Sequence, residues 1–425
     1  MTILRSEQAQ LSGAVKIPGS KSHTIRGLAI ATLAEGRSEL LDALDSADTR
    51  ACVDACRALG ARIETGEVWI VEGTGGRLKA GEGIIDVQNS GTTLYIVLGM
   101  AALAEGWNEF TGDAQIQKRS AQPLLDALKA LGAQAESAQG NGCVPIRIKG
   151  PMRGGHVSIA CPTSQYLTSL LIASPLAAEE TRITVTELNE APYVQITLDW
   201  LDGQGIRYSQ ENLREFIIEG GQTYKPMSQR IKADFSSATF FLCAAAITGS
   251  ELTLGGLDMT DSQGDKAVVG MLERMGAVVE VQPNAVRIRG GALHGVDIDL
   301  NATPDAMPAM AITGCFAEGT TRLLNVPQAR IKETDRIAVM CEVVNALGGK
   351  AEELPDGLVV HGAGLKGGRA PGYGDHRVVM ACGVAGLAAE RLVEVDTAEA
   401  AAVTFPSFVE LMNSAGAKMT VSEAK

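Results

Sequence analysis

Residues 90–106 read SGTTLYIVLGMAALAEG, a stretch of small and apolar residues that predicts a helix ending at an Ala/Glu/Gly stop. Similar stretches recur at intervals of roughly 70 residues, which indicates a repeat architecture and must be recognised before the fold is assigned. The other copies are KSHTIRGLAIATLAEG (21–36), TSQYLTSLLIASPLAAE (163–179), SSATFFLCAAAITGS (236–250), PDAMPAMAITGCFAEG (304–319) and DHRVVMACGVAGLAAE (375–390).

A second predicted helix follows each copy and ends at a glycine. In the first repeat, Val53, Cys56 and Leu59 recur with helical spacing on one face. A glycine suits the left-handed position after a helix, where a Cβ is costly. The six glycines are Gly60, Gly132, Gly205, Gly276, Gly348 and Gly416.

Short alternating segments after these glycines predict strands. They are VWIVEG (68–73), VPIRIKG (144–150), EFIIEG (215–220), VRIRGG (286–291) and LVVHGAG (358–364). Helices alternating with strands place the chain in the α/β or α+β class. Six units divide naturally into two domains of three, with the change near residues 229–233. The first helix of each unit is apolar on all sides, which predicts that these helices form the inner core.

Composition narrows the function classes. The chain has 425 residues, 45% of them hydrophobic, and a formal net charge of -13, which argues against a nucleic-acid binder. The start of the chain lacks a signal peptide pattern, and the apolar stretches are too short to cross a bilayer. The eight cysteines mostly lie in apolar helical runs, and the five histidines show no ligand spacing. We therefore expect a soluble cytoplasmic monomer with free thiols, no metal and no membrane partner.

The predicted starts of the first helices carry polar and charged residues. Helix N-termini attract anions, although capping by Ser, Thr, Asn and Asp is the commoner role of such residues. RIKETDR (330–336) packs three cations with two acids, and Asp305 heads an otherwise uncharged helix. The pattern favours a site for a multiply anionic small molecule. The cations near these starts are Lys21, Arg26, Arg119, Lys332, Arg336 and Arg377.

Six motifs in this order resemble the 5-enolpyruvylshikimate-3-phosphate synthase family. They are PGSKSHTIR (18–26), NSGT (89–92), TSQYLT (163–168), PDA (304–306), RIKETDR (330–336) and GDHR (374–377), and the likeness extends through TFPSF (404–408). The resemblance implies an enolpyruvyl transferase fold of two similar domains, each of three βαββαβ-type repeats. It implies a discontinuous domain of residues 1–19 and 233–425, a domain of residues 20–232, and an active site in the cleft between them.

The resemblance also implies which residues bind the two substrates. The residues expected to contact the acceptor, shikimate 3-phosphate, are Lys21, Ser22, Arg26, Thr163, Ser164, Gln165, Tyr193, Asp305, Gln328 and Lys332. Those expected to contact phosphoenolpyruvate are Lys21, Gly91, Arg119, Gln165, Arg336, His376 and Arg377. Arginine suits a carboxylate because its guanidinium donates two parallel hydrogen bonds.

The implied reaction is an addition followed by an elimination, in the shikimate pathway to chorismate and the aromatic amino acids. By family analogy, Asp305 takes the proton of the acceptor hydroxyl and Glu333 handles the proton of the methylene carbon. Lys21 neutralises the departing phosphate. The reaction needs no metal or organic cofactor.

Several residues depart from the family pattern. Leu94, Tyr95 and Ile96 replace a usual Met-Arg-Pro, Gln328 replaces an asparagine, and Val403 stands where many members have a lysine. Glu190 occupies a place where a serine or threonine commonly assists the substrate phosphate. A carboxylate about 4 Å from a phosphate would repel it by roughly 4 kcal/mol at an effective dielectric near 20. Glu190 therefore points away, the acceptor is less charged there, or the matching of residues 187–193 is displaced.

These departures leave alternatives. A diverged carboxyvinyltransferase with another hydroxylated acceptor is the second hypothesis, and a binding protein without activity is the third. The related UDP-N-acetylglucosamine transferases carry a cysteine in the loop that corresponds to residues 111–123, where this chain has none. Tyr95 and Ile96 also predict reduced sensitivity to glyphosate, because a shifted helix disfavours that inhibitor more than phosphoenolpyruvate.

Overall fold

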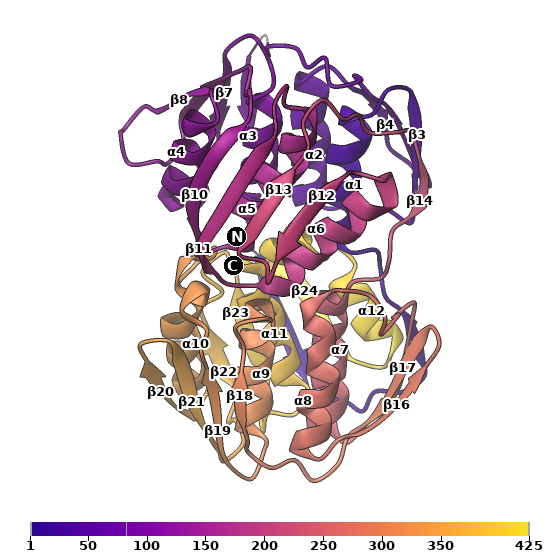
Figure 1. Ribbon diagram of the computed structural model, residues 1–425. Coiled ribbons are helices and arrows are strands. Elements are labelled where there is room, and N and C mark those ends of the chain that lie inside the picture. Colours follow the sequence, from indigo (N-terminus) through magenta and orange to yellow (C-terminus); the bar gives the residue numbers. More distant parts are fainter. Residues whose placement is uncertain (1, 82, 424–425) are drawn as a thin grey trace. The chain divides into compact units, whose positions relative to one another are not determined.

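The computed structural model describes residues 2–81 and 83–423. The chain forms two compact units, which Figure 1 shows coloured along the sequence. The N-terminal unit is Gly19–Ile231, and the C-terminal unit combines Met1–Pro18 with Lys232–Lys425. The chain therefore passes from one unit to the other twice, between Pro18 and Gly19 and between Ile231 and Lys232.

Within the described residues, three nearly completely buried helices form the inside of each unit. Their burial follows from their composition, because they present small and apolar side chains in every direction. All residues of α3, α9 and α11 are buried, as the sequence predicted. The inner helices are α1 (Lys21–Leu33), α3 (Gly91–Ala101) and α5 (Ser164–Ala173) in the N-terminal unit, and α7 (Phe235–Thr248), α9 (Met307–Cys315) and α11 (His376–Gly386) in the C-terminal unit.

The second helix of each repeat packs closer to the surface. The glycines predicted to follow these helices all have positive φ, between 70° and 111°. A side chain is disfavoured in this conformation, so the prediction of a glycine stop is confirmed six times. The helices are α2 (Ala47–Ala58), α4 (Gln122–Ala130), α6 (Ala191–Gln204), α8 (Ala267–Met275), α10 (Arg336–Ala346) and α12 (Phe408–Ser414).

The described strands form four-stranded sheets that share one topology: a parallel pair followed by two antiparallel pairs. In the N-terminal unit their orders are β14 (Ser228–Arg230), β3 (Arg37–Leu41), β5 (Val68–Glu72), β4 (Arg62–Glu64); β6 (Ile84–Asp86), β7 (Asn108–Thr111), β9 (Ile146–Lys149), β8 (Gln134–Ser137); and β10 (Gly155–Cys161), β11 (Thr181–Leu188), β13 (Glu215–Ile218), β12 (Tyr208–Glu211). The strands predicted from alternation at residues 68–73, 144–150 and 215–220 are β5, β9 and β13.

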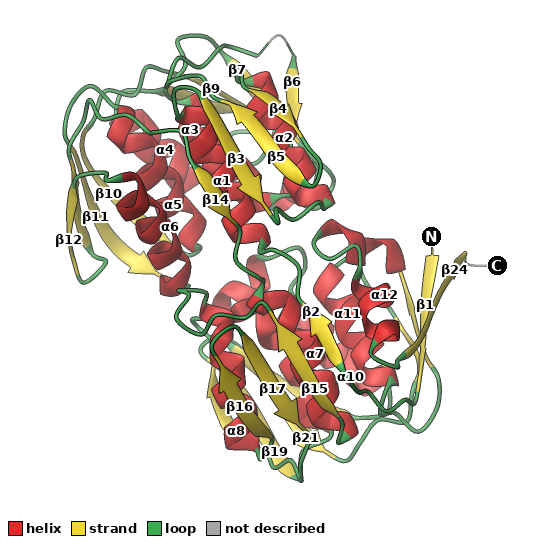
Figure 2. Ribbon diagram, turned by 90° about the vertical axis from the view of Figure 1, so that its right-hand side faces the viewer, coloured by secondary structure: helices red, strands yellow, loops and turns green. Residues whose placement is uncertain are grey.

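The sheets of the C-terminal unit repeat this topology and lie outside its helices (Figure 2). Two of them are completed by strands from the start of the chain. β2 (Ala14–Lys16) pairs with β15 (Glu251–Gly255), and β1 (Thr2–Glu7) pairs with both β23 (Val393–Asp396) and β24 (Lys418–Glu423). The orders are β2 (Ala14–Lys16), β15 (Glu251–Gly255), β17 (Ala285–Arg289), β16 (Val278–Gln282); β18 (Asp297–Asp299), β19 (Gly319–Leu324), β21 (Gly357–Gly362), β20 (Lys350–Leu354); and β22 (Gly368–Ala370), β23 (Val393–Asp396), β1 (Thr2–Glu7), β24 (Lys418–Glu423).

The fifth inner helix copy differs from its prediction. The sequence predicted one helix from Pro304, but Pro304–Ala306 forms a 3₁₀ turn and α9 begins at Met307. Proline lacks the N–H that an α-helix needs beyond its first turn, so Pro308 is compatible only with a helix that begins close to it. In addition, α7 begins at Phe235, one residue before the predicted start, and Asp234 caps it by accepting a hydrogen bond from the Ser237 amide at 3.0 Å.

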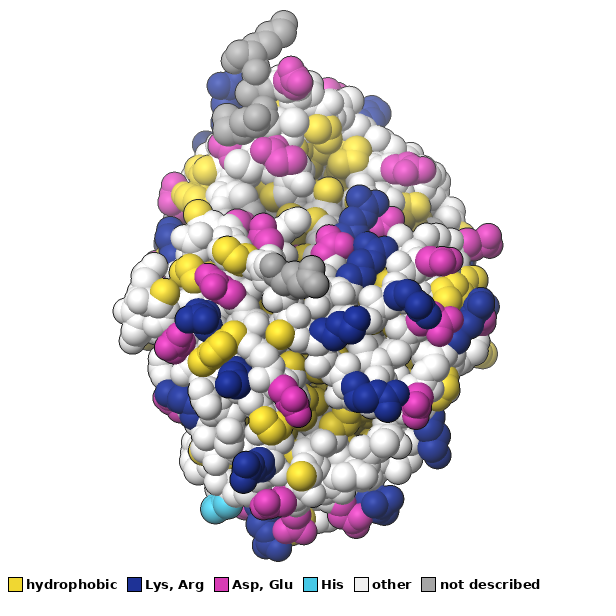
Figure 3. All heavy atoms as spheres, turned by 90° about the horizontal axis from the view of Figure 1, so that it is seen from above, with side chains coloured by type: hydrophobic (Ala, Val, Ile, Leu, Met, Phe, Trp, Pro, Cys, Tyr) yellow, Lys and Arg dark blue, Asp and Glu magenta, His cyan; other side chains and the backbone are white. Residues whose placement is uncertain are grey.

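The surface carries charges of both signs. Figure 3 shows basic and acidic side chains interspersed over one face of the molecule. Over the described ranges, every helix is too short or too polar to span a bilayer. All eight cysteines are free thiols, and seven of them are buried, which confirms the expectation from the sequence.

Candidate functional site

The residues predicted to bind substrates are divided between the two units. The N-terminal unit holds Lys21, Ser22, Arg26, Gly91, Arg119, Thr163, Ser164, Gln165 and Tyr193, and the C-terminal unit holds Asp305, Gln328, Lys332, Glu333, Arg336, His376 and Arg377. Most of them lie at the starts of inner helices. Backbone N–H groups without helical partners are available at these starts, so the fold concentrates anion-binding groups there.

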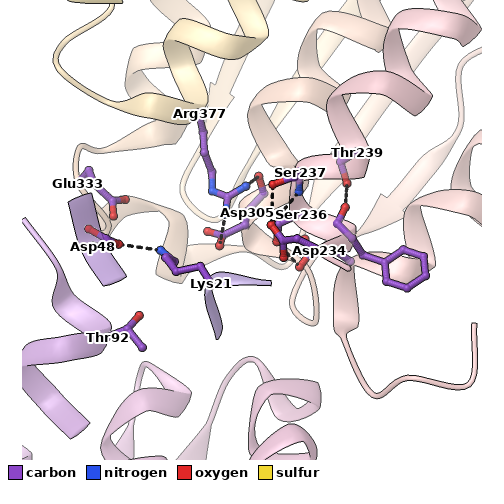
Figure 4. A network of polar contacts seen from close by, with 12 residues as sticks. Lys21, Asp48, Thr92, Asp234, Ser236, Ser237, Thr239, Asp305, Glu333 and Arg377 are labelled. Atoms are coloured by element: carbon purple, nitrogen blue, oxygen red, sulfur yellow. Dashed lines mark hydrogen bonds and ion pairs between the residues drawn. The ribbon is translucent and has the colours of Figure 1, made fainter. Parts of the chain in front are cut away.

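The start of α1 carries two predicted cations. Lys21 donates from Nζ to Oδ2 of Asp48 at 3.0 Å, and the Asp48 side chain is only 5% exposed (Figure 4). Arg26, one turn further, is completely buried and makes four hydrogen bonds to neutral oxygens. These are the hydroxyls of Thr197 and Thr168 and the carbonyls of Ser22 and Tyr193. Burial lowers the pKa of Arg26 to about 10, while the charges of Tyr193 and Glu190 raise it.

The start of α3 places a guanidinium against a glycine. A Cβ at Gly91 would lie 2.9 Å from Nη1 of Arg119 and 3.1 Å from its Cζ. The missing side chain therefore allows Arg119 to approach the N-terminus of α3. Ser90 caps the helix, and Gln165 of α5 donates from Nε2 to the Thr92 hydroxyl at 3.0 Å. Gly91, Arg119 and Gln165, three of the residues predicted to contact phosphoenolpyruvate, thus all lie at the start of α3.

The start of α5 is occupied by Glu190. Its Oε2 accepts hydrogen bonds from the Ser164 hydroxyl at 2.8 Å, the Ser164 amide at 3.2 Å and the Thr163 hydroxyl at 3.2 Å. Glu190 is 2% exposed and precedes α6 in a left-handed conformation with φ of 58°. The carboxylate thus points toward Thr163 and Ser164, which the family resemblance implies as contacts near the acceptor phosphate. The first sequence-based expectation, that Glu190 points away from these residues, is therefore wrong.

Arg336 is the centre of the charged cluster in the C-terminal unit. Its side chain is 1% exposed and donates to Asp375 from Nε at 2.9 Å and from Nη2 at 3.1 Å. It also donates from Nη1 to Asp305 at 2.8 Å and from Nη2 to Glu333 at 2.5 Å. Burial opposes the charge, but the three carboxylates together raise the pKa of Arg336 above its ordinary value.

Asp305 connects this arginine with a second one. Its Oδ1 accepts from Arg336, while its Oδ2 lies 2.9 Å from Nη2 of Arg377 (Figure 4). The sequence left open whether Asp305 caps its helix; the N-cap residue of the 3₁₀ turn is Thr303, and Asp305 lies within the turn. Asp305 and Glu333, the two predicted proton-transfer groups, are therefore both held by Arg336.

Polar atoms without protein partners lie beside this cluster. His376 begins α11, is 2% exposed, and its Nε2 has no hydrogen-bond partner among the described residues. Gln328 is also 2% exposed; its Nε2 donates to the Asn301 carbonyl at 2.8 Å, but its Oε1 is unpaired within the described residues. Lys332 is half-buried at the end of the 3₁₀ turn Pro327–Ile331. Buried polar atoms are usually paired, so these atoms of His376 and Gln328 are available to hydrogen-bond with a ligand or with water.

Sequence reasoning missed two acids that hold predicted site residues. Asp48 pairs with Lys21 from 27 positions away, and Asp375 pairs with Arg336 from 39 positions away. A pattern shared by the repeats could have predicted that Asp48 contacts the start of α1. Glu190 lies 26 positions after Ser164, and Asp265 lies 29 positions after Ser236, and both acids accept from these serines. An acid at this spacing thus contacts the inner helix start in three repeats.

Comparisons with known proteins assign the family. The model of the EPSP synthase (3-phosphoshikimate 1-carboxyvinyltransferase) family matches residues 6–412. The 3-phosphoshikimate 1-carboxyvinyltransferase of Acetivibrio thermocellus is 53% identical over 99% of this chain and 100% of its own length, and that of Ruminiclostridium cellulolyticum is 49% identical over 98% and 99%. A solved EPSP synthase from Acinetobacter baumannii is 27% identical, with complete coverage of both chains and a TM-score of 0.84. The chain therefore belongs to the EPSP synthase family of 3-phosphoshikimate 1-carboxyvinyltransferases.

Proposed function

We propose that this chain transfers the carboxyvinyl group of phosphoenolpyruvate to the 5-hydroxyl of shikimate 3-phosphate and releases phosphate. The observation that carries the proposal is the position of Asp305, which two arginines hold at 2.8 and 2.9 Å at the start of an inner helix. Family membership favours this acceptor over the alternative of a diverged transferase with another acceptor.

In the proposed mechanism, the acceptor hydroxyl adds to the central carbon of phosphoenolpyruvate while the methylene carbon gains a proton. Asp305 takes the hydroxyl proton and Glu333 exchanges the methylene proton. The tetrahedral adduct then loses phosphate, the new methyl group returns one proton, and the vinyl double bond forms again. The salt bridges of Asp305 and Glu333 with Arg336 fix the positions of both carboxylates before substrates arrive.

The predicted cations have different roles in this proposal. Lys21 and Arg119 neutralise the phosphate that leaves, and Arg336 and Arg377 face the carboxylate of phosphoenolpyruvate. Burial lowers the pKa of His376 to about 3, so its imidazole is neutral near pH 7 and offers one N–H and one acceptor nitrogen. His376 can therefore contact phosphoenolpyruvate without adding charge.

We further propose a cytoplasmic monomer, in keeping with eight free thiols.

Release of phosphate from phosphoenolpyruvate tests this function. The protein should release phosphate only when shikimate 3-phosphate is also present. Asp305→Asn should lower kcat by roughly 10²–10⁴-fold, the usual size of general acid–base contributions. Asp297→Asn is the matched control, because Asp297 is exposed and pairs only at the surface with Arg322 at 3.2 Å. Absence of phosphate release with wild-type protein would reject the proposed function.

A further inference from the structure

The inference concerns Glu190 and the donors that it occupies. Glu190 is the N-cap residue of α6, yet its side chain makes no capping hydrogen bond to that helix. It reaches α5 instead, where the hydroxyls of Thr163 and Ser164 and the Ser164 amide all donate to one oxygen, Oε2. Three converging donors at a helix N-terminus form the type of environment that binds an anionic oxygen. The carboxylate therefore fills an anion-binding position.

The surroundings of this position carry positive charge. Arg26 is buried, and its four hydrogen bonds go to neutral oxygens of Thr197, Thr168, Ser22 and Tyr193. The nearby negative charge of Glu190 favours the charged guanidinium, whose burial alone would disfavour it. The negative charge of Glu190 thus compensates both the positive charge of Arg26 and the partial positive charge at the N-terminus of α5. Any anion that replaced Glu190 would have to do the same.

The other repeats show that such an acid belongs to the architecture. Asp265 lies in the 3₁₀ turn Gly264–Lys266 and accepts from the Ser236 hydroxyl at 2.8 Å, at the start of α7. No substrate contact is expected at α7, so there the acid only completes the helix start. At α5 the same arrangement coincides with Thr163 and Ser164, which are expected to contact the acceptor phosphate. The repeat's own acid and the substrate's phosphate therefore require the same donors.

We propose that Glu190 is a displaceable substitute for the acceptor's phosphate, and that it weakens the binding of acceptors that carry a dianionic group. This inference rests on the proposed function. In the absence of acceptor, the Glu190 carboxylate satisfies Thr163 and Ser164. When the phosphate binds, the Glu190 side chain rotates away and the phosphate takes its donors. Glu190 is thus a specificity-determining residue, which acts on acceptor affinity and not on the chemical step.

Steady-state kinetics of Glu190→Gln distinguish an effect on acceptor affinity from an effect on the chemical step. Glutamine keeps the size and the acceptor oxygen but removes the charge. We expect the KM for shikimate 3-phosphate to fall by about tenfold or more, because like charges no longer compete for one position. The KM for phosphoenolpyruvate and kcat should change less than about twofold. Unphosphorylated shikimate should show no comparable gain. A purely structural role would alter both KM values or kcat instead.

Glu187→Gln is the matched control, because Glu187 is an exposed glutamate of the preceding strand, β11. It should leave both KM values unchanged. An unchanged or raised KM for shikimate 3-phosphate in Glu190→Gln would overturn the inference while leaving the proposed function intact. Lack of turnover by the wild-type protein would reject both.

A structure of the wild-type protein with shikimate 3-phosphate gives a test that needs no variant. The phosphate should accept from Ser164, and Glu190 should have left the hydrogen-bond distance of 2.8 Å from the Ser164 hydroxyl. A complex in which Glu190 keeps these hydrogen bonds, with the phosphate bound elsewhere, would overturn the inference even if Glu190→Gln failed to fold.

Discussion

A buried arginine needs compensation for its charge, and Arg336 obtains it from three side chains. Asp375, which is completely buried, accepts from Nε and Nη2, Asp305 accepts from Nη1, and Glu333 also accepts from Nη2. Although burial opposes ionisation of Asp375, Arg336 lowers the pKa of this carboxyl below its ordinary value. Removal of the arginine would therefore leave three acids close together with no compensating cation.

Arg336→Met should lower the free energy of unfolding by about 3–5 kcal/mol, the usual cost of removing one partner of a buried ion pair. Urea unfolding measures this change. Arg322→Met serves as the control, since Arg322 and Asp297 form an exposed pair and its loss should cost less than about 1 kcal/mol. Equal losses for both variants would show that the three carboxylates do not depend on Arg336.

His376 should make stability dependent on pH. Burial lowers its pKa from 6.5 to about 3, so the unfolded chain binds a proton in this range that the folded chain does not. The stabilisation from the neutral His376 is complete above the pKa of histidine in the unfolded chain, 6.5, and is lost as the pH falls below it. We expect the free energy of unfolding to decrease from about pH 6.5 to about pH 4.5 by about 1.4 kcal/mol per unit.

Urea unfolding of His376→Gln at the same pH values should show a flatter dependence. His156→Gln is the control, because His156 is exposed and its loss should leave the wild-type slope. Identical slopes in the wild-type protein and in His376→Gln would contradict the assignment of the proton to His376.

At the scale of elements, the close approach of Arg119 to α3 depends on Gly91. A Cβ there would lie 2.9 Å from Nη1, so Gly91→Ala should displace the guanidinium. We expect a higher KM for phosphoenolpyruvate, by roughly tenfold, which corresponds to about 1.4 kcal/mol. The KM for shikimate 3-phosphate should rise less.

Steady-state kinetics check this expectation. Gly270→Ala provides the control, because a Cβ at Gly270 of α8 would meet no atom within 4 Å and alanine favours the helix. If Gly91→Ala raised both KM values equally, the change would act through α3 as a whole and not through Arg119.

Local patterns predicted the elements well because each depends on a few neighbouring residues. The glycines after the second helices, including Gly60 and Gly416, have the positive φ that motivated their assignment. Inner helices such as α3 are buried on all sides, as their composition required. The family inferred from six short motifs is also confirmed.

The direction of individual side chains could not be predicted in this way. Glu190 was recognised as unusual, but nothing in the sequence around it shows that its carboxylate reaches Ser164. The hydrogen bonds between Arg336 and Asp375 join two repeats and arise only when α10 and α11 pack. Tyr95 shows the same limit, since its edge-to-face contact with Tyr166 at 5.0 Å joins α3 to α5. The reduced sensitivity to glyphosate stays a prediction.

At the scale of the whole molecule, the N-terminal unit is continuous in sequence, whereas the C-terminal unit is not. The last strand of the N-terminal unit, β14, pairs in parallel with β3 and completes the first sheet. A fragment of residues 19–231 contains every strand of the three sheets described for this unit. We expect this fragment to unfold cooperatively in urea when expressed alone.

A fragment of residues 19–227 is the matched control. It lacks β14, so one edge of β3 loses its backbone partners at Glu39, Leu40 and Leu41. This fragment should unfold at a lower urea concentration than the longer one. If neither fragment unfolded cooperatively, the N-terminal unit would depend on the rest of the chain for its stability.

The double passage of the chain has a consequence for biosynthesis. A ribosome makes β1 and β2 first, but their partners β15, β23 and β24 lie beyond residue 250. The strands of the N-terminal unit are complete once residue 231 has emerged, so this unit can fold during translation. β1 and β2 then remain without their partner strands while the second half of the chain is made. Nascent chains stalled after residue 231 has emerged from the ribosome should therefore resist proteolysis within residues 19–231, while residues 2–16 remain cleavable.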